Sequence, residues 1–400
     1  MSGPLTGIRI LDATTVVLGP LAAQILGDMG ADVVKIEPPD GDTTRQLGPA
    51  RNPGMAALYL TCNRNKRSLV LDLKQSKGRE TLLRLAADAH VLMHNWRPQA
   101  AVRLGLEYDA VRAAAPSIVY VATYGFRAKG PYGHRPAYDD VIQAASGLTS
   151  LQSAVAGEPR YVPTIMADKT SGMAVVQAVL AALLHRERTG EGQAVEVPML
   201  ETLVSFVMVE HLYGETFVPA VETSGYKRIL ARSRKPFRTK DGHLSILPYT
   251  DAHWRAFFTM TGREDLLADP RFSSLAKRLA NIEILYAELA KIAETRTSSE
   301  WLTALDEAGI PAMVVNTLET VLTDPHLEAT GFWKTMEHPT EGTLRMPDPP
   351  YGFSKTPSAI RRLPPRLGEH SVEVLREAGF GGDEIDALVK SGVTRDGASG

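Results

Sequence analysis

The 400-residue sequence is poor in cysteine and in long apolar runs. Its one cysteine, Cys62, cannot form an internal disulfide, and a single thiol excludes Cys-x-x-Cys zinc and redox sites. The longest apolar run, 172–184, is interrupted by Gln177 and is shorter than the ~20 residues of a membrane span. The first twelve residues contain no basic leader followed by an apolar stretch. These absences predict a soluble protein of the reducing cytoplasm.

The sequence also has no excess of either charge. Forty-four Lys and Arg residues stand against 46 Asp and Glu, which leaves a net charge of −2. This balance excludes a global field that would recruit nucleic acid or an anionic membrane, so any anion must be bound locally. With 44% hydrophobic residues, the composition is typical of a globular protein, and the length indicates two or three domains.

Common metal and hydrolase motifs are missing as well. No HExxH is present; His90 and His94 have i, i+4 spacing but lie in a strand-like run without an intervening acid. No G-x-S-x-G marks a serine hydrolase, and Cys62 is more typical of a small buried residue than of a nucleophile. We therefore expect no metal site.

Strand-like and helix-like patterns alternate through the first half of the sequence. Strand-like runs lie at 8–14, 31–37, 68–73, 90–95 and 117–124, and helical patterns lie at 21–29, 77–87 and 103–115. Such alternation is typical of βαβ units, which build a parallel sheet covered on both faces. The sequence predicts a Rossmann-like α/β domain.

The second half begins with two helical patterns, 171–188 and 200–213, separated by a short strand at 194–197. Beyond Gly225 a hairpin at 236–247, turned by Asp241-Gly242, precedes three predicted helices, the last opened by the capping box Thr297-x-x-Glu300. Seven prolines between 339 and 365 favour an extended return segment. We predict a large domain over 1–220, a smaller α+β domain over 221–334, and a segment over 335–400 that completes the large domain.

The first βαβ unit would suit a dinucleotide, because Glu37 ends the second strand where a ribose-binding acid lies in Rossmann folds. The glycine pattern differs, however. The turn reads V-V-L-G-P instead of GxGxxG, and Pro20 removes an amide donor that would face a pyrophosphate. The turn favours a Rossmann-like unit without NAD.

Two charged features have both a structural and a functional interpretation. The run Arg64-Asn65-Lys66-Arg67, with Lys74, Arg97 and Arg103, would gather phosphates at one sheet edge, although solvated loop charges are the simpler interpretation. Asp168 precedes a long helix and is most simply an N-cap or first-turn acid. The same place suits a nucleophilic carboxylate, since helix-terminal amides stabilise anions.

Ten separate motifs, in this order, run nearly from end to end of the sequence. They are G-I-R-I-L-D (7–12) with G-P (19–20), G-A-D-V-V-K-I-E-P (30–38), N-K-R-S-L-V-L-D-L-K (65–74), N-W-R-P (95–98), R-L-G-L (103–106), Y-D-D-V-I-Q-A-A-S-G (138–147), Asp168 before S-G-M, R-T-G-E-G-Q (188–193), A-G-I-P (308–311) and L-G-E-H (367–370). Together they resemble the family III coenzyme A transferases, which include formyl-CoA transferase, carnitine CoA transferase and the 2-methylacyl-CoA racemases.

The resemblance implies a set of site residues and an interlocked homodimer. Asp168 falls on the family's nucleophilic aspartate. Coenzyme A is implied as a substrate and not as a bound cofactor, with an acyl-CoA donor and a free carboxylic acid as acceptor. The implied CoA-binding residues are Val17, Leu18, Pro38, Leu71, Asp72, Leu73, Lys74, Asn95, Trp96, Arg97, Arg103, Arg135, Pro136, Ala137 and Tyr138.

The implied chemistry is CoA transfer through an aspartyl-acyl anhydride and an aspartyl-CoA thioester, both high-energy acyl compounds that keep the exchange near thermoneutral. Backbone amides are expected to stabilise the oxyanion. Two departures from formyl-CoA transferase make formate and oxalate poor candidate substrates. Its arginine is replaced by Pro38, and its tetraglycine lid has no counterpart near 232–235.

Two other functions stay open at this point. In the racemases a Gly-His-Asp motif supplies a proton-transferring histidine, but the aligned residues here are Ala137-Tyr138-Asp139, and a phenol is a poor base at neutral pH. His134, four residues upstream of Tyr138, would be the substitute in a 2-methylacyl-CoA racemase. A non-enzymatic acyl-CoA-binding protein is the third possibility.

Overall fold

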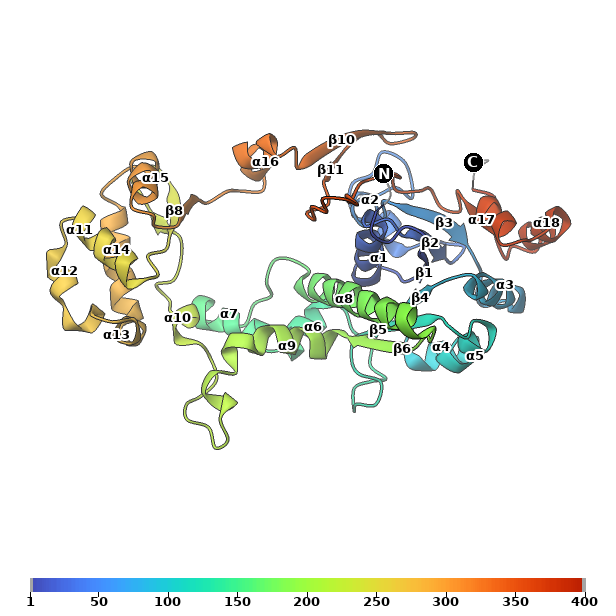
Figure 1. Cartoon of the computed structure of the whole chain (residues 1–400), viewed down its shortest axis with the longest axis horizontal. Helices are drawn as coiled ribbons and strands as arrows, with labels where there is room; N and C mark the ends of the chain where they lie inside the picture. The colour runs from blue at the N-terminus through green and yellow to red at the C-terminus, as the bar shows by residue number, and fades with distance from the viewer. Residues whose placement is uncertain (1–2, 398–400) are drawn as a thin grey trace. The chain divides into compact units, whose positions relative to one another are not determined.

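The computed structural model describes residues 3–397 and divides into two units. The first unit comprises the chain up to Ser146, Val162–Phe206 and the chain from Glu328 onward, so it combines both ends of the sequence (Figure 1). The second unit comprises Gly147–Tyr161 and Val207–Leu327. The units are defined by contacts between residues, so the predicted domain boundaries at 220 and 335 stay a prediction about folding.

The first unit is built on a six-stranded parallel sheet in the order β3-β2-β1-β4-β5-β6. Its strands are β1 (Arg9–Ala13), β2 (Asp32–Glu37), β3 (Lys66–Val70), β4 (Val91–His94), β5 (Val119–Tyr124) and β6 (Ala194–Pro198). The strand order reverses between β1 and β4, and open α/β sheets bind their ligands at such a reversal, outside the carboxyl ends of the strands. The predicted Rossmann-like α/β architecture is confirmed.

Helices cover both faces of this sheet. Leu11 and Leu92 point to one face, where they pack with residues of α3 (Ser76–Ala87), α5 (Tyr108–Ala114), α17 (Ser371–Glu377) and α18 (Gly382–Lys390). The other face carries α1 (Leu18–Asp28) and α8 (Met166–Thr189), which pack against each other (Figure 1). The remaining helices of this unit are η1 (Thr43–Gln46), α2 (Ala57–Cys62), α4 (Pro98–Leu104) and α6 (Asp139–Ala145).

Helix α8 is longer than the sequence indicated. Within residues 3–397 it is one helix that is long and apolar enough to cross a membrane by length and composition, with a mean hydropathy of 1.2. Its first turn lies outside the predicted helical pattern because the polar residues Asp168, Lys169 and Thr170 interrupt the apolar pattern there. In this structure α8 packs on α1, β5 and β6, and it buries Val175 and Val179 completely.

Two local expectations need correction. The single helix predicted over 103–115 is two helices, because Gly105 adopts a left-handed conformation (φ 64°) and ends α4. The proline-rich return segment contains part of a two-stranded antiparallel hairpin, β10 (Trp333–His338) and β11 (Gly342–Pro347). A two-stranded hairpin tolerates proline at its ends, whereas a central strand would not.

The second unit has a three-stranded sheet, β7-β8-β9, surrounded by helices. Its elements are α7 (Leu148–Ala156), η2 (Tyr213–Thr216), α10 (Lys227–Leu230), β7 (Phe237–Arg238), β8 (His243–Ile246), α11 (Asp251–Met260), α12 (Glu264–Ala268), η3 (Pro270–Phe272), α13 (Leu275–Ala280), α14 (Ile282–Ala293), α15 (Ser298–Glu307), β9 (Ala312–Val314) and η4 (Thr320–Thr323). Helices α9 (Met199–His211) and α16 (Pro325–Ala329) cross the boundaries between the units.

The predicted hairpin and capping box of this unit are confirmed. β7 pairs antiparallel with β8, and Thr297 and Glu300 exchange both capping hydrogen bonds at the start of α15. The expectation of three helices is wrong, since α11 to α15 are five. The side chains of Asp269 and Ser274 each accept a backbone hydrogen bond and begin new helical segments there.

Candidate functional site

The predicted CoA-binding residues follow the carboxyl ends of the parallel strands. Leu71–Lys74 follow β3, Pro38 follows β2, Val17 and Leu18 open α1 after β1, Asn95–Arg97 follow β4, and Arg135–Tyr138 lie on the segment after β5. Since parallel strands end at one edge of a sheet, the fold brings these segments to a common edge, while Arg103 lies in the last turn of α4. Their roles in binding stay predictions.

The turn between β1 and α1 is held in a strained conformation. Val16 has a φ of 72°, which a β-branched residue rarely adopts. Its amide donates to the carboxylate of Asp42 (3.2 Å), and Lys35 Nζ donates both to Asp42 (2.9 Å) and to the carbonyl of Thr14 (3.1 Å). Strain of this kind persists only where surrounding contacts impose it, and it is concentrated at functional sites. The network thereby fixes the start of α1.

Buried ion pairs lie beneath this turn. Lys66 Nζ donates to the carboxylate of Asp12 and to the carbonyl of Pro20, at 2.9 and 2.8 Å, and both charged side chains are fully buried. Arg45 holds Glu37 through two hydrogen bonds of 2.8 Å. The first pair ties β3 to β1, and the second ties η1 to the end of β2.

This network corrects the interpretation of the basic run 64–67. All four residues are buried, so they are neither solvated loop charges nor a phosphate site. Arg64 pairs with Asp28 (2.8 Å), and Arg67 pairs with Asp32, Glu373 and Glu377 at 2.7–2.9 Å. The acids that neutralise the run are distant in sequence, which is why local spacing suggested solvent exposure.

Asp168 lies in the first turn of α8, as one of the two structural interpretations predicted. It is not the N-cap, which is Ile165. One turn further, a Cβ atom at Gly172 would lie 2.8 Å from the carbonyl oxygen of Leu18, so only glycine permits α8 to approach the start of α1 this closely. Residues four apart share a helix face. The fold therefore places Asp168 on the face of α8 that packs at the N-terminus of α1.

The surroundings of Asp168 favour its neutral form. Burial, and to a lesser extent the carboxylate of Asp139, raise the pKa of Asp168 from 3.8 to about 7. Asp139 lies in the first turn of α6, where it accepts a hydrogen bond from the backbone amide of Asp168 (3.0 Å) and one from Gln143 Nε2 (2.6 Å). Asp168 is thus a half-buried carboxylate that titrates near neutral pH, and strongly shifted acids of this kind are candidates for catalysis.

Several predicted positions touch one another or the sheet. Asn95 exchanges hydrogen bonds with the backbone of Thr15, at 3.2 Å to its amide and 2.9 Å to its carbonyl. Trp96 stacks on His94 with ring centroids 4.6 Å apart. A Cβ atom on Gly125 would lie 2.3 Å from the Cβ of Ala137, so Ala137 lies against the end of β5.

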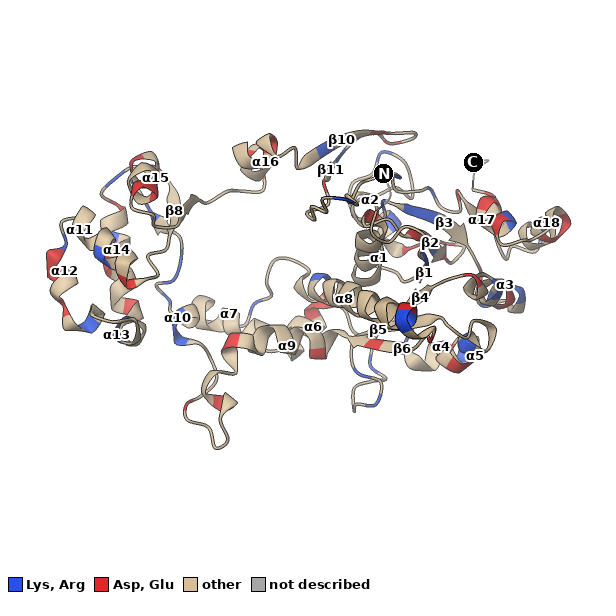
Figure 2. Cartoon of the chain, in the orientation of Figure 1, with Lys and Arg blue, Asp and Glu red and all other residues tan. Residues whose placement is uncertain are grey.

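The cations predicted to bind CoA are exposed to solvent, unlike the cations of the buried ion pairs. Lys74, Arg97, Arg103 and Arg135 are all exposed. Figure 2 shows the charges of the first unit as a mixture of both signs. The carboxylate of Asp72 accepts from the amide of Lys74 (3.0 Å), so this side chain shapes the turn that follows β3. Exposed cations at a strand-end edge can reach a phosphate without first breaking a buried pair.

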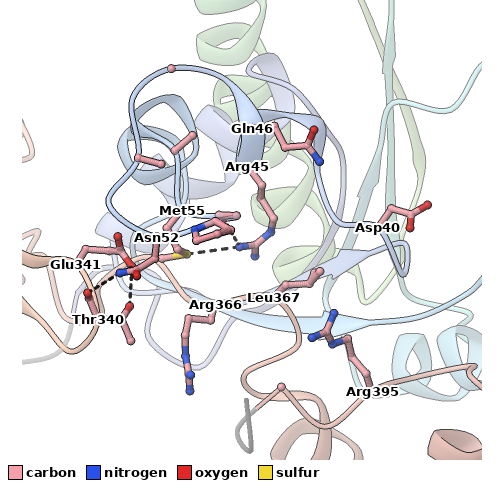
Figure 3. Close-up of a pocket in the computed structure, with 16 residues that line it drawn as sticks. Asp40, Arg45, Gln46, Asn52, Met55, Thr340, Glu341, Arg366, Leu367 and Arg395 are labelled. Atoms are coloured by element: carbon pink, nitrogen blue, oxygen red, sulfur yellow. Dashed lines mark hydrogen bonds between the residues drawn. The ribbon is translucent and has the colours of Figure 1, made fainter.

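A separate cavity of about 920 Å³ opens beside the segment that follows β2 (Figure 3). Asp40, Asn52, Glu341, Arg366 and Arg395 are among its lining residues, and none of the predicted CoA residues lines it. Asn52 Nδ2 donates to one carboxylate oxygen of Glu341 (3.1 Å), and the other oxygen is buried without a hydrogen bond to any described residue. The cavity is therefore separate from the residues that the family resemblance assigns to CoA.

Sequence reasoning missed the supporting residues of this site. Asp139 stood in the quoted motif Y-D-D without a role, and Lys35 and Asp42 were not singled out. Two adjacent acids before a helical pattern were the available signal for Asp139. Nothing local marked Lys35, because its partners lie in the turns that follow β2 and β1, namely Asp42 and the carbonyl of Thr14. Among residues 3–397, no three His, Cys, Asp or Glu side chains form a group that could hold a metal ion.

Comparisons with known proteins agree over nearly the whole chain. A probable fatty acyl-CoA transferase of Mycobacterium tuberculosis, Rv3272, is 33% identical over 385 residues, which cover 93% of this chain and 97% of that protein. Its orthorhombic crystal structure has a TM-score of 0.80 and covers 93% of this chain and 99% of that chain. Human succinyl-CoA:glutarate CoA-transferase is 30% identical over 395 residues, covering 98% of this chain and 90% of that protein.

A crystal structure of a CAIB/BAIF family protein from Brucella suis is also similar, with a TM-score of 0.78, 29% identity, and coverage of 94% of this chain and all of that chain. The family description "CoA-transferase family III" matches residues 5–371. With the predicted family thus confirmed, the chain belongs to CoA-transferase family III and is a CoA-transferase.

Proposed function

We propose that this enzyme moves coenzyme A from an acyl-CoA thioester to a free carboxylic acid with Asp168 as the covalent nucleophile. The observation that carries the proposal is the setting of Asp168: a half-buried carboxylate in the first turn of α8, without a cation partner among the described residues, whose pKa is raised to about 7. A carboxylate that is poorly stabilised as an anion gains more from becoming acylated than a salt-bridged one does.

The reaction balances without an external proton. The Asp168 carboxylate attacks the thioester carbonyl, the C–S bond breaks, and CoA leaves as a thiolate from a mixed anhydride. The thiolate attacks the aspartyl carbonyl, the anhydride C–O bond breaks, and the donor acid leaves as a carboxylate. The acceptor carboxylate then attacks the aspartyl-CoA thioester, and the same steps in reverse order regenerate Asp168. No metal or cofactor is needed in these steps.

The start of α1 supplies the donors that each tetrahedral intermediate needs. The amides of Leu18 and Gly19 are first-turn amides without an intrahelical partner, and no side chain caps them. Backbone amides at a helix N-terminus carry partial positive charge and cost no reorganisation when an oxyanion forms. The pinned turn at Val16 and the contact of Gly172 with Leu18 support this assignment.

We further propose that CoA lies along the strand-end edge, with Lys74 and Arg103 on its phosphates. Both side chains are exposed, and neither has an ion-pair partner within the described part of the chain. The donor and acceptor are carboxylic acids as a class. Fatty acyl-CoA, succinyl-CoA and glutarate are named for the similar proteins, and they form the first panel of substrates to test.

We also propose an interlocked homodimer that works in the cytoplasm. Large apolar side chains are unusually exposed on α9 and the chain that follows it, and on the chain that follows β9: Phe206, Val209, Phe217, Val218 and Val221 on the first, and Val315 and Leu318 on the second, with Val209 82% and Val218 96% exposed. Exposed apolar surface of this extent marks interaction sites. A second copy that covers both stretches would bury it.

One exchange experiment tests the function. The chain is incubated with an acyl-CoA donor and an equimolar panel of free acids, and the new thioesters are identified by mass. New acyl-CoA species with matching release of donor acid support the proposal. Hydrolysis alone, or binding without exchange, would contradict it. The same mixture in deuterium oxide tests 2-methylacyl-CoA racemisation, in which α-deuterium would accumulate without any acceptor.

A further inference from the structure

The second unit contains a small cavity lined by three cations and no acid. It has a volume of about 300 Å³ and lies between α10, the segment 231–236, β7, β8 and α14. Its lining residues are Arg228, Arg234, Lys235, Pro236, Phe237, Ser245, Ile246, Leu247 and Tyr286. All belong to one unit, so the cavity is complete within it.

Part of the cavity lining comes from a strongly basic stretch of the chain. Residues 227–238 (K-R-I-L-A-R-S-R-K-P-F-R) contain six cations and no acid. Figure 2 shows their blue on α10 and on the segment between α10 and β8. Lys227 is neutralised by Glu222, but the side chains of Arg234 and Lys235 have no hydrogen-bond or ion-pair partner among residues 3–397. The positive charge at the mouth of the cavity is therefore available to a ligand.

Backbone contacts hold this segment in place. The carboxylate of Glu283 accepts from the amides of Arg232 (2.5 Å) and Ser233 (3.0 Å), and the amide of Arg234 donates to the carbonyl of Ala231 (3.0 Å). Glu283 thus lies beside the segment, outside the cavity lining, and is hydrogen-bonded by main-chain groups. A loop that is held by its backbone presents its cations with less ordering cost on binding.

The inner part of the cavity is apolar with two polar groups. Phe237 and Ile246 are 5% and 3% exposed, and Tyr286 packs edge-on against Phe237. Arg228 Nε donates to the hydroxyl of Tyr286 (3.2 Å), which fixes this guanidinium at the inner side. The cavity therefore offers an apolar surface between cations, which suits methylene groups between anionic ends.

We propose that this cavity binds a short aliphatic dicarboxylate. An arginine fork pairs two oxygens of a planar carboxylate, and three cations without an acid favour a dianion over a monoanion. The volume lies at the small end of ligand sites, too small for a whole coenzyme A. The inference goes beyond the proposed function and does not depend on it, because every residue of the cavity lining belongs to the second unit whereas Asp168 belongs to the first.

The test is direct binding of glutarate to the full-length chain by calorimetry, without acyl-CoA. The test variant is Arg234→Gln/Lys235→Gln. The matched control is Arg238→Gln/Lys240→Gln, which removes the last cation of the same stretch and the next one beyond it, neither of which lines the cavity. We expect the test variant to bind glutarate at least about tenfold more weakly than wild type, and the control to bind like wild type. Pentanoate, with the same chain and one carboxylate, is expected to bind wild type at least about tenfold more weakly than glutarate.

Equal glutarate affinity in the test variant and wild type would overturn the proposal. Binding of inorganic phosphate as tight as that of glutarate would make this a general anion site, and displacement of glutarate by CoA would make it a phosphate site; both outcomes also overturn it. If the double variant unfolds, Lys235→Gln alone is measured against Lys240→Gln. The Asp168→Asn chain separates this inference from the proposed function, because it is expected to bind glutarate like wild type even though it cannot transfer CoA.

Discussion

Two groups of carboxylates in the first unit have opposite electrostatic surroundings. Beneath the turn from β1 to α1, Asp12 and Asp42 are buried beside lysines. Burial would raise the pKa of Asp12, but Lys66, Lys35 and the hydroxyl of Thr14 hold it below its ordinary value. Asp42 is held low in the same way by Lys35 and Thr44. At the start of α8, Asp168 has burial and another carboxylate around it, and its pKa rises instead.

This contrast distinguishes carboxylates that stabilise the fold from the carboxylate that we propose reacts, although both groups lie near the same edge of the sheet. A buried acid whose charge is neutralised by a lysine is stable as an anion and has little tendency to attack a thioester. An acid without such a partner keeps its charge only at a cost, and this cost makes it reactive. Position at the sheet edge alone would not distinguish the two groups, because both lie near the start of α1.

Asp168→Asn gives the largest expected effect. The amide keeps nearly the same volume but cannot form the anhydride, so we expect CoA transfer to fall by more than about a thousandfold while CoA affinity and the melting temperature are kept. The adduct provides a second measurement: wild type treated with acyl-CoA and then hydroxylamine should carry a modified Asp168 in peptide mass spectra. Near-normal turnover of the variant would show that another residue is the nucleophile.

Lys66→Met tests the other side of the comparison. Removal of this ammonium leaves Asp12 buried without its closest cation, and breaking a buried pair typically costs about 3–5 kcal/mol of unfolding free energy. Chemical denaturation measures this loss. The matched control is Lys77→Met, which breaks an exposed pair with Glu80 and should leave the free energy of unfolding nearly unchanged, because solvent screens that pair. Equal, small losses in both variants would show that the buried network does not stabilise the fold.

Local patterns predicted the parts of this molecule whose cause is local. The alternation of strands and helices, the turn at Asp241-Gly242, the capping box at Thr297 and the place of Asp168 in a first helical turn all depend on neighbouring residues, and the structure has each of them. The predictions that merged or miscounted helices were wrong where a single residue, such as Gly105, ends an otherwise continuous pattern.

Long-range electrostatics could not be predicted in this way. Lys66 pairs with Asp12, from which it is separated by 54 positions in the sequence. The amide of Asp168 donates to Asp139, at a separation of 29 positions. A basic run such as 64–67 has the same local pattern whether it is exposed or buried against distant acids. The pKa of Asp168 likewise depends on burial by several segments, so the sequence could suggest the residue but not its state of ionisation.

Arg103→Ala tests whether an exposed cation contributes to CoA binding instead of to stability. Unlike Lys66, Arg103 is exposed, so we expect no effect on stability but a loss of about 1.5–3 kcal/mol in CoA binding, roughly ten- to a hundredfold in Kd. Calorimetry with CoA measures it, and Arg112→Ala on the neighbouring helix α5 is the control. Unchanged CoA affinity in Arg103→Ala would remove this residue from the site.

The pH dependence of transfer gives the smallest and most specific effect. Since Asp168 must be a carboxylate to attack, and its pKa in the folded protein is about 7, kcat/KM is expected to fall as the pH drops through this value. Asp139→Asn removes a like charge, which lowers the pKa of Asp168, so the acidic limb should move to lower pH. The move is expected to be less than about one pH unit, because burial, the larger cause, is unchanged.

Asp140→Asn is the matched control, since Asp140 is exposed on the next position of α6 and its removal should leave the limb in place. A limb that moves to higher pH in Asp139→Asn, or that moves equally in the two variants, would show that the charge of Asp139 does not govern the ionisation of Asp168.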